Sequence, residues 1–191
     1  MRAFKIGAVG LERSMFDFGV RAEAVEIGAV VPGDELVVDA DVVMDRGFTL
    51  PVPPTSAWPW FAQLGKNRAG WYLPRWVEAV LPVRRRALRR IDPALQVLVP
   101  GDVIDDWGGA GATFEVVRHE APGVIVYWSV RGRVRFSWVI LLTARAGQAT
   151  RVHLRLRIGG VRRRWLVEYG GGLFDLLTVA GLAAGLRERV T

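Results

Sequence analysis

Two segments near the C-terminus decide the fold: Arg133-Val-Arg-Phe-Ser-Trp-Val-Ile-Leu-Leu-Thr-Ala144 and Ala149-Thr-Arg-Val-His-Leu-Arg-Leu-Arg-Ile158. Both alternate apolar and polar side chains with a period of two, which is typical of β-strands that present different faces. An Ala-Gly-Gln link joins them and predicts an antiparallel hairpin. The predicted apolar face carries Val134, Phe136, Trp138, Ile140, Leu142, Val152, Leu154, Leu156 and Ile158. The other face carries Arg133, Arg135, Ser137, Arg151, His153, Arg155 and Arg157, and we expect it to be solvated and basic.

Further strands and two short helices are predicted upstream of this hairpin. Strands are expected near residues 102–106, 112–119 and 123–130, so that five sequential antiparallel strands form a meander. A first strand is expected at Gly47–Val52. It is followed by a helix at 57–64, capped by Thr55 or Ser56 with Pro59 in its first turn and closed by Gly65, and by a second helix at 74–80.

The last segment predicts a long helix. The stretch Leu173–Leu186 is apolar nearly all round, as in a helix buried on several sides. Glu168 and Asp175 interrupt the apolar window, and the uncharged run is shorter than the roughly 20 residues that span a bilayer, so a buried helix is favoured over a membrane span. The triplet Gly170-Gly171-Gly172 predicts a kink or break just before it.

Composition sets limits on the chemistry. The chain has 191 residues, enough for one full core, with a formal charge of +7. It contains no cysteine and only two histidines, His119 and His153, which excludes disulfides, thiolate chemistry and a typical zinc site. We therefore expect no metal and no cofactor. The N-terminus lacks the pattern of a cleaved signal peptide, and a cytoplasmic location is expected.

Several motifs resemble the bacterial polyketide cyclase/dehydrase-like branch of the SRPBCC superfamily, which includes START domains and birch-pollen-allergen-like proteins. The resemblance covers residues 31–191 and depends on Phe48-Thr-Leu-Pro-Val-Pro-Pro54, Ala57-Trp-Pro-Trp-Phe-Ala-Gln-Leu-Gly65, Arg68-Ala-Gly-Trp-Tyr72 and Trp76-Val-Glu78. It implies an α+β helix-grip fold, in which a curved antiparallel sheet of six to seven strands wraps on a long C-terminal helix, with two short helices after the first strand. Residues 1–45 are then an N-terminal extension, with a short helix at 12–27, and 46–191 a START-like ligand-binding domain.

The resemblance also implies a function: such domains bind lipids, polyketides or other apolar ligands, and only some are enzymes. We expect a cavity between the apolar sheet face and the terminal helix. Core packing is the alternative role for each aromatic or aliphatic residue there. The expected ligand-binding residues are Trp71, Tyr72, Trp76, Phe114, Trp128, Phe136, Trp138, Leu154, Leu156, Phe174 and Leu177.

Two other functions stay open at this point. A cyclase/dehydratase-like enzyme would need acids and bases such as Glu115, Asp105 or Tyr127, and nothing in the sequence selects one of them. A peripheral membrane or protein interaction module would use the apolar helix and the arginines at 84–90 and 162–164 in weak association with an anionic membrane surface. Nucleic acid is not expected as a partner, because the aromatic residues lie on the face opposite the arginines. Both a monomer and a homodimer are consistent with these expectations.

Overall fold

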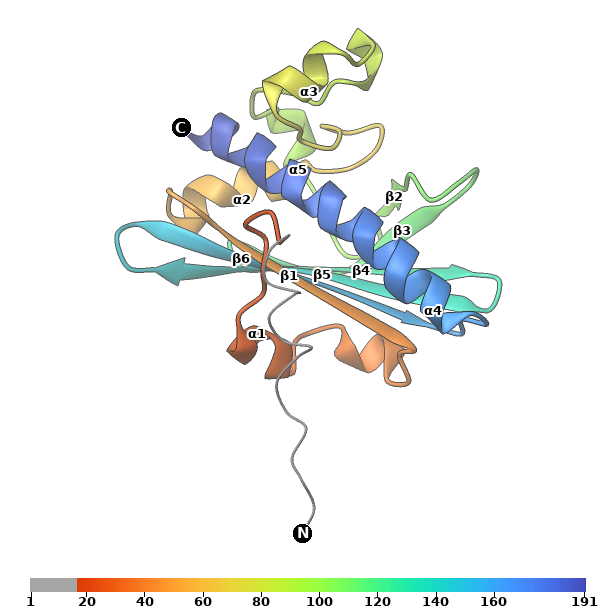
Figure 1. Ribbon diagram of the computed structural model, residues 1–191. Helices are drawn as coiled ribbons and strands as arrows, with labels where there is room; N and C mark the ends of the chain where they lie inside the picture. The colour runs from red at the N-terminus through yellow and green to blue at the C-terminus, as the bar shows by residue number, and fades with distance from the viewer. Residues whose placement is uncertain (1–16) are drawn as a thin grey trace.

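Six strands form one antiparallel sheet in the computed structural model, which describes residues 17–191 (Figure 1). The order is β1-β6-β5-β4-β3-β2, so β2 to β6 form the predicted meander and β1 pairs with β6. The strands are β1 (Val42–Leu50), β2 (Val103–Asp105), β3 (Thr113–Glu120), β4 (Val124–Arg131), β5 (Val134–Arg145) and β6 (Ala149–Gly159). The first strand begins five residues earlier than expected at Gly47, because Val42 to Arg46 continue the pairing with β6.

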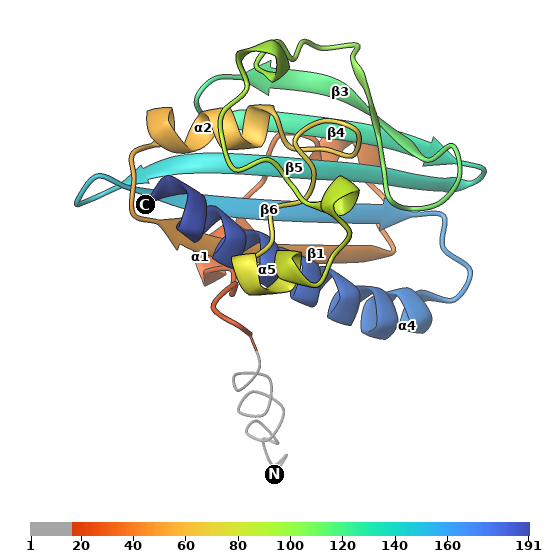
Figure 2. The ribbon, with the colours of Figure 1, turned by 90° about the horizontal axis from the view of Figure 1, so that it is seen from above.

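A long C-terminal helix crosses one face of this sheet (Figures 1 and 2). It comprises α4 (Arg164–Leu166), a π-helical segment η5 (Val167–Gly171) and α5 (Gly172–Val190). On α5 the side chains of Val179, Leu182 and Leu186 are buried in the main core. The predicted covering helix is therefore confirmed, and by length and composition alone the whole helix, Arg164–Val190, could also cross a membrane.

Of the kink or break predicted at the three glycines, the break is wrong, since the helix continues there as a π-helical segment. Gly172 has helical dihedral angles, φ −63° and ψ −37°, and the helix passes through the glycines by widening into a π-turn. Glycine in a helix costs about 1 kcal/mol per residue, which tertiary contacts can offset. One such contact comes from β1, where Arg46 Nη2 donates a hydrogen bond of 3.0 Å to the Gly172 carbonyl.

Two short helices follow β1, as predicted: α2 (Pro54–Ala62) and α3 (Arg75–Ala79). The predicted cap of α2 is wrong, since Pro53 is the N-cap and no side chain caps the helix. Pro59 consequently lies inside α2 and not in its first turn, and the helix ends before Gly65. Short 3₁₀ turns complete this region at η3 (Val83–Arg85) and η4 (Pro93–Leu95).

Residues 23–41, here called the N-terminal strap, cover the opposite face of the sheet from α5 (Figure 1). The strap contains α1 (Ala24–Gly28) and the 3₁₀ turn η2 (Asp34–Val37). The helix predicted at 12–27 falls partly outside the described residues, and within them only α1 is helical. Ser137 of β5 donates a buried hydrogen bond of 2.7 Å to the carbonyl of Gly33, which fixes the strap close to the sheet.

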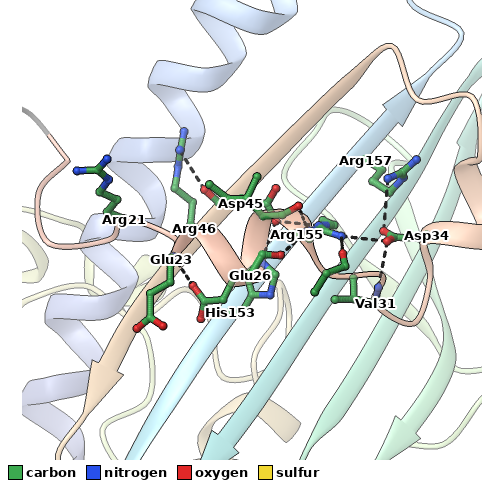
Figure 3. Close-up of polar contacts among 12 residues, drawn as sticks. Arg21, Glu23, Glu26, Val31, Asp34, Asp45, Arg46, His153, Arg155 and Arg157 are labelled. Carbon is green, nitrogen blue, oxygen red and sulfur yellow. Dashed lines mark hydrogen bonds and ion pairs between the residues drawn. The ribbon is translucent and has the colours of Figure 1, made fainter. Parts of the chain in front are cut away.

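The expectation of a solvated basic face is wrong, because the strap buries its central side chains in a polar network (Figure 3). Arg155 is only 3% exposed and His153 5%. The Asp45 carboxylate accepts hydrogen bonds from Arg155 Nε at 2.8 Å and from His153 Nε2 at 2.7 Å. Burial alone would raise the pKa of Asp45, but these two hydrogen bonds outweigh it and hold the pKa below its usual value.

The strap supplies the remaining partners of the network. Arg155 Nη1 lies 2.9 Å from Asp34, and its guanidinium also donates to backbone carbonyls of the strap at Glu26, Ile27 and Ala29. Arg151 forms a two-pronged contact with the Glu26 carboxylate at 2.7 and 2.8 Å. These arginines therefore join the strap to the sheet and are not available as a free anionic-partner site.

Candidate ligand-binding cavity

A cavity of about 600 Å³ lies between the sheet and α5. This volume is within the range of roughly 300–1,000 Å³ that small-molecule sites occupy. Its walls are mostly apolar and come from every strand of the sheet, the loop after α2, the β2–β3 loop and α5. The lining residues are Met44, Leu64, Gly65, Trp71, Ile104, Asp105, Asp106, Trp107, Gly108, Phe114, Tyr127, Arg131, Phe136, Trp138, Leu156, Ile158, Gly171, Phe174, Asp175, Thr178 and Val179.

The sheet supplies an aromatic wall. Tyr127 of β4 and Trp138 of β5 are paired in register, so both side chains project to the same face, and their rings stack with centroids 5.2 Å apart. Phe114 of β3 contacts both Tyr127 and Trp138 through tilted or edge contacts at 6.2 Å. Adjacent strands thus present a continuous π-surface toward the cavity.

Trp71 connects this wall to the terminal helix. Its ring stacks on Trp138 at 6.1 Å, and its Nε1 donates a hydrogen bond of 3.0 Å to the carbonyl of Thr178 on α5. Trp107 of the β2–β3 loop meets Trp71 edge to face at 5.8 Å and is half-exposed. Phe174 lines the cavity from α5 and is 69% exposed. Trp107 and Phe174 therefore mark the place where the cavity opens to the surface.

A cationic group lies at one end of the aromatic wall. The Arg131 guanidinium sits over the rings of Phe136 and Phe114, at 4.7 and 5.0 Å from their centroids. It also forms an ion pair of 2.6 Å with Asp106 and donates to Ser129 Oγ at 3.1 Å. Its charge is therefore balanced locally while its planar face packs on aromatic rings.

A second ion pair joins the helix to the edge strand. Asp175 Oδ2 lies 2.9 Å from Arg46 Nε, and both side chains are largely buried. Burial raises the pKa of Asp175, and the attraction of Arg46 offsets only part of that effect. Burial likewise raises the pKa of the Tyr127 hydroxyl. The cavity therefore holds two acidic groups that retain their protons more readily than in water.

Replacing Asp175 by Asn tests this assignment through stability against pH. A raised pKa in the folded state means that folded protein binds the proton more tightly than unfolded protein, so wild-type stability falls as pH rises above the unfolded-state pKa of about 4. The Asn variant lacks this titration. The unfolding free energy of wild type minus that of the variant should consequently decrease as pH rises from about 4 through the folded-state pKa. Urea titrations across this window measure it, and a difference that increases with pH would contradict the assignment.

Comparison with known proteins identifies the fold. No protein-family model and no curated protein matches the chain. The solved structure of jhp0584 from Helicobacter pylori aligns over 85% of this chain and 95% of its own, with 10% identity and a TM-score of 0.54. The chain has the helix-grip fold.

Two other solved structures align at lower scores. Ms6760 from Mycobacterium smegmatis has 15% identity over 85% of this chain and 96% of its own, with a TM-score of 0.47. CalU16 from Micromonospora echinospora has 14% identity over 78% of this chain and 83% of its own, with a TM-score of 0.44.

Six of the residues expected at the ligand site line the cavity in this helix-grip domain: Trp71, Phe114, Phe136, Trp138, Leu156 and Phe174. Five others do not. Tyr72 is fully buried and donates its hydroxyl to the Trp60 carbonyl at 2.9 Å. Leu154 belongs to the closed part of the core. Trp76 on α3 and Leu177 on α5 are 76% and 51% exposed, since each lies on the outer side of its helix.

Trp128 is the fifth, and its predicted direction is wrong. It pairs with Ser137, which contacts the strap, so it projects away from the cavity, and its neighbour Tyr127 faces the cavity in its place. The β4 sequence Val-Ile-Val-Tyr-Trp is apolar on both faces and hence has no alternation that could set its parity. Glu115 pairs with Trp128 and shares its direction, so it too lies away from the cavity.

The remaining acid and base candidates have defined places. Asp105 lines the cavity and accepts a hydrogen bond of 2.6 Å from Asn67. His119 packs against Trp58 with ring centroids 5.0 Å apart, and burial lowers its pKa. Residues 17–191 contain no group of three or more His, Asp or Glu that could hold a metal ion.

Some lining residues could not be expected from the sequence. Met44 lies before the predicted start of the first strand, although its spacing from Phe48 gives it the same parity. Trp107 and Asp106 lie in the β2–β3 loop, where no periodicity indicates a direction. Asp175 interrupts the apolar helix, and this interruption was a usable signal of its place at the cavity.

Proposed function

We propose that the cavity binds a hydrophobic small molecule, such as a lipid or a polyketide, and that binding itself is the function. The observation that carries the proposal is the cavity of about 600 Å³ with an aromatic wall and few polar groups. Burial of an apolar ligand against such walls is favourable by roughly 25 cal/mol per Å² of area removed from water. Among its charged lining groups, Arg131 is paired with Asp106, and Asp175 is paired with Arg46 behind the cavity wall.

The test fills the cavity without altering its surroundings. Leu156 lies opposite Trp138 on β6 and lines the cavity, so Leu156→Trp should occupy the space that a ligand would use. Leu177→Trp is the matched control, because Leu177 is 51% exposed on the outer side of α5. Both variants are titrated with the fluorescent fatty acid cis-parinaric acid, and native mass spectrometry identifies molecules that co-purify with the wild type.

We expect saturable binding of the probe by the wild type and by Leu177→Trp, and at least about tenfold weaker binding by Leu156→Trp. Thermal denaturation checks that the variants stay folded. Equal affinity of Leu156→Trp and wild type would show that the probe binds elsewhere and would overturn the proposal.

A cyclase- or dehydratase-like enzyme is the second candidate. It is favoured by one observation: Asp175 and Tyr127 line an apolar cavity, and burial raises the pKa of both, so each would serve as a proton donor. If the co-purifying ligand is converted by the wild type and bound without conversion by Tyr127→Phe, catalysis replaces binding as the function.

A further inference from the structure

The first half of the terminal helix exposes a row of large apolar side chains. Trp165, Tyr169, Leu173 and Leu177 follow each other at four-residue spacing and therefore share one face of the helix. With Leu166 and Phe174 they form what we call the apolar stripe, and each of the six is more than half exposed, from 51% for Leu177 to 70% for Tyr169. Only 28% of the helix's apolar stretch is buried, and the fully buried residues, from Val179 to Leu186, all lie in its C-terminal half.

Arginines surround the start of this stripe. Arg162, Arg163 and Arg164 precede it and are exposed, and exposed Arg133 lies beside them because its carbonyl adjoins Gly160. Within residues 17–191 the one ion pair of Arg164 is a loose contact of 3.7 Å with exposed Glu168. Exposed pairs of this kind contribute about 0–1 kcal/mol. The arginine cluster is thus open to an external anion.

The fold itself does not account for these charges. Arg163 is the N-cap of α4 and Arg164 its first residue. Cations at this end meet the positive pole of the helix dipole and are unfavourable there. A partner of opposite charge would offset this unfavourable interaction.

We propose that the apolar stripe and the cluster of Arg133, Arg162, Arg163 and Arg164 dock the protein on an anionic membrane surface. Tryptophan and tyrosine are enriched where a bilayer meets water, and arginines beside them attract anionic headgroups. A second copy of the chain would bring the same positive cluster and so lacks the complementary charge. An anionic membrane surface therefore complements both the apolar stripe and the arginine cluster.

The position of the stripe connects it to the cavity. Phe174 belongs to the stripe and also lines the cavity, near where it opens. Docking would place that opening against the bilayer, so that an apolar ligand could enter without crossing water. This link to ligand entry rests on the proposed function, whereas docking itself does not.

Flotation of the full chain with vesicles tests docking. Vesicles of phosphatidylcholine alone are compared with vesicles that also contain phosphatidylglycerol. The variant Trp165→Ser/Tyr169→Ser/Leu173→Ser removes stripe residues that do not line the cavity. Its control, Val80→Ser/Val83→Ser/Val97→Ser, removes three side chains elsewhere that are 82%, 77% and 73% exposed. A second variant, Arg162→Gln/Arg163→Gln, removes two charges of the arginine cluster. Its control, Arg84→Gln/Arg85→Gln, removes two charges at exposed residues elsewhere.

We expect the wild type and both controls to float with the anionic vesicles, and more weakly as salt is raised. The stripe variant should stay unbound, and Arg162→Gln/Arg163→Gln should partition about 25-fold more weakly, at roughly fivefold per arginine. The variants should keep wild-type affinity for cis-parinaric acid without vesicles, which separates failure of docking from failure of the cavity.

Three results would overturn the proposal. One is unchanged flotation of the stripe variant, and another is an equal loss in the two arginine pairs, which would indicate attraction by net charge alone. The third is a wild type that sediments as a dimer and does not float, together with a stripe variant that sediments as a monomer. That result would assign the stripe to a second copy of the chain.

Discussion

Deletion of residues 173–191 should unfold or aggregate the protein. This segment of α5 places Val179, Leu182, Ala183 and Leu186 in the core, where each is at most 3% exposed. Full burial of one large aliphatic side chain contributes about 1.5–3 kcal/mol, and a domain's whole stability is about 5–15 kcal/mol. The deletion would also uncover the apolar sheet face that α5 covers (Figure 2).

A buried charge adds to the effect. Arg189 near the end of α5 is paired with Glu78 at 2.6 Å, and their side chains are 1% and 5% exposed. Deletion removes this partner and leaves Glu78 with Arg89, at 2.8 Å, as its ion-pair partner. Circular dichroism and size-exclusion chromatography measure the outcome. A truncated protein that stays monomeric with near-native thermal stability would contradict the role of α5 as the covering layer.

A full-length variant gives the same test without a deletion. A Cβ at Gly185 would lie 2.7 Å from backbone atoms of Tyr72 and Leu73, so Gly185→Leu should push α5 away from the loop after α2. Gly172→Leu is its control on the same helix, since no atom lies within 4 Å of a Cβ there. We expect a large loss of thermal stability in the first variant and little change in the second.

Replacement of Arg155 by Ala should cost about 3–5 kcal/mol of unfolding free energy. The substitution leaves the carboxylates of Asp34 and Asp45 and three strap carbonyls short of a donor in a site that is shielded from water. Urea denaturation measures the loss. Arg145→Gln is the matched control, because its ion pair of 2.7 Å with Glu23 is exposed and should contribute about 0–1 kcal/mol.

The cause can be separated from lost packing. If the orphaned carboxylate dominates the cost, adding Asp45→Asn to Arg155→Ala should recover part of the stability, since the amide is cheaper to bury than an unpaired charge. Two results together would contradict this role of the polar network. They are no recovery of stability in the double variant, and a loss of unfolding free energy for Arg155→Ala no greater than that for Arg145→Gln.

The sequence predicted those parts of the fold that depend on short-range patterns. The alternation of apolar and polar residues in β5 and β6 predicted that Phe136, Trp138 and Leu156 share one face of the sheet, and the structure agrees. The continuous apolar run of the terminal segment predicted a covering helix. These predictions succeed because the period of 2 residues in a strand and of 3.6 residues in a helix is visible in the identities of neighbouring residues.

The same patterns failed where both faces of the sheet are covered. The β4 run around Trp128 has no alternation, so its parity was open until the register with β5 was known. The arginines of β6 had the parity of a solvated face, yet the strap buries Arg155 and partly covers Arg151 and Arg157. The strap lies more than 100 residues earlier in the chain, so no local pattern could indicate this.

By itself the sequence determined the faces of β5 and β6, the terminal helix and the lack of cysteine chemistry, since each is a property of composition or of local spacing. Only the tertiary structure decided that the basic face of β6 is buried by the strap, that Tyr127 and Asp175 line the cavity, and that the first half of the terminal helix is exposed. Each of these depends on which distant segment covers a given face. The spacing of residues along one strand or helix carries no information about that.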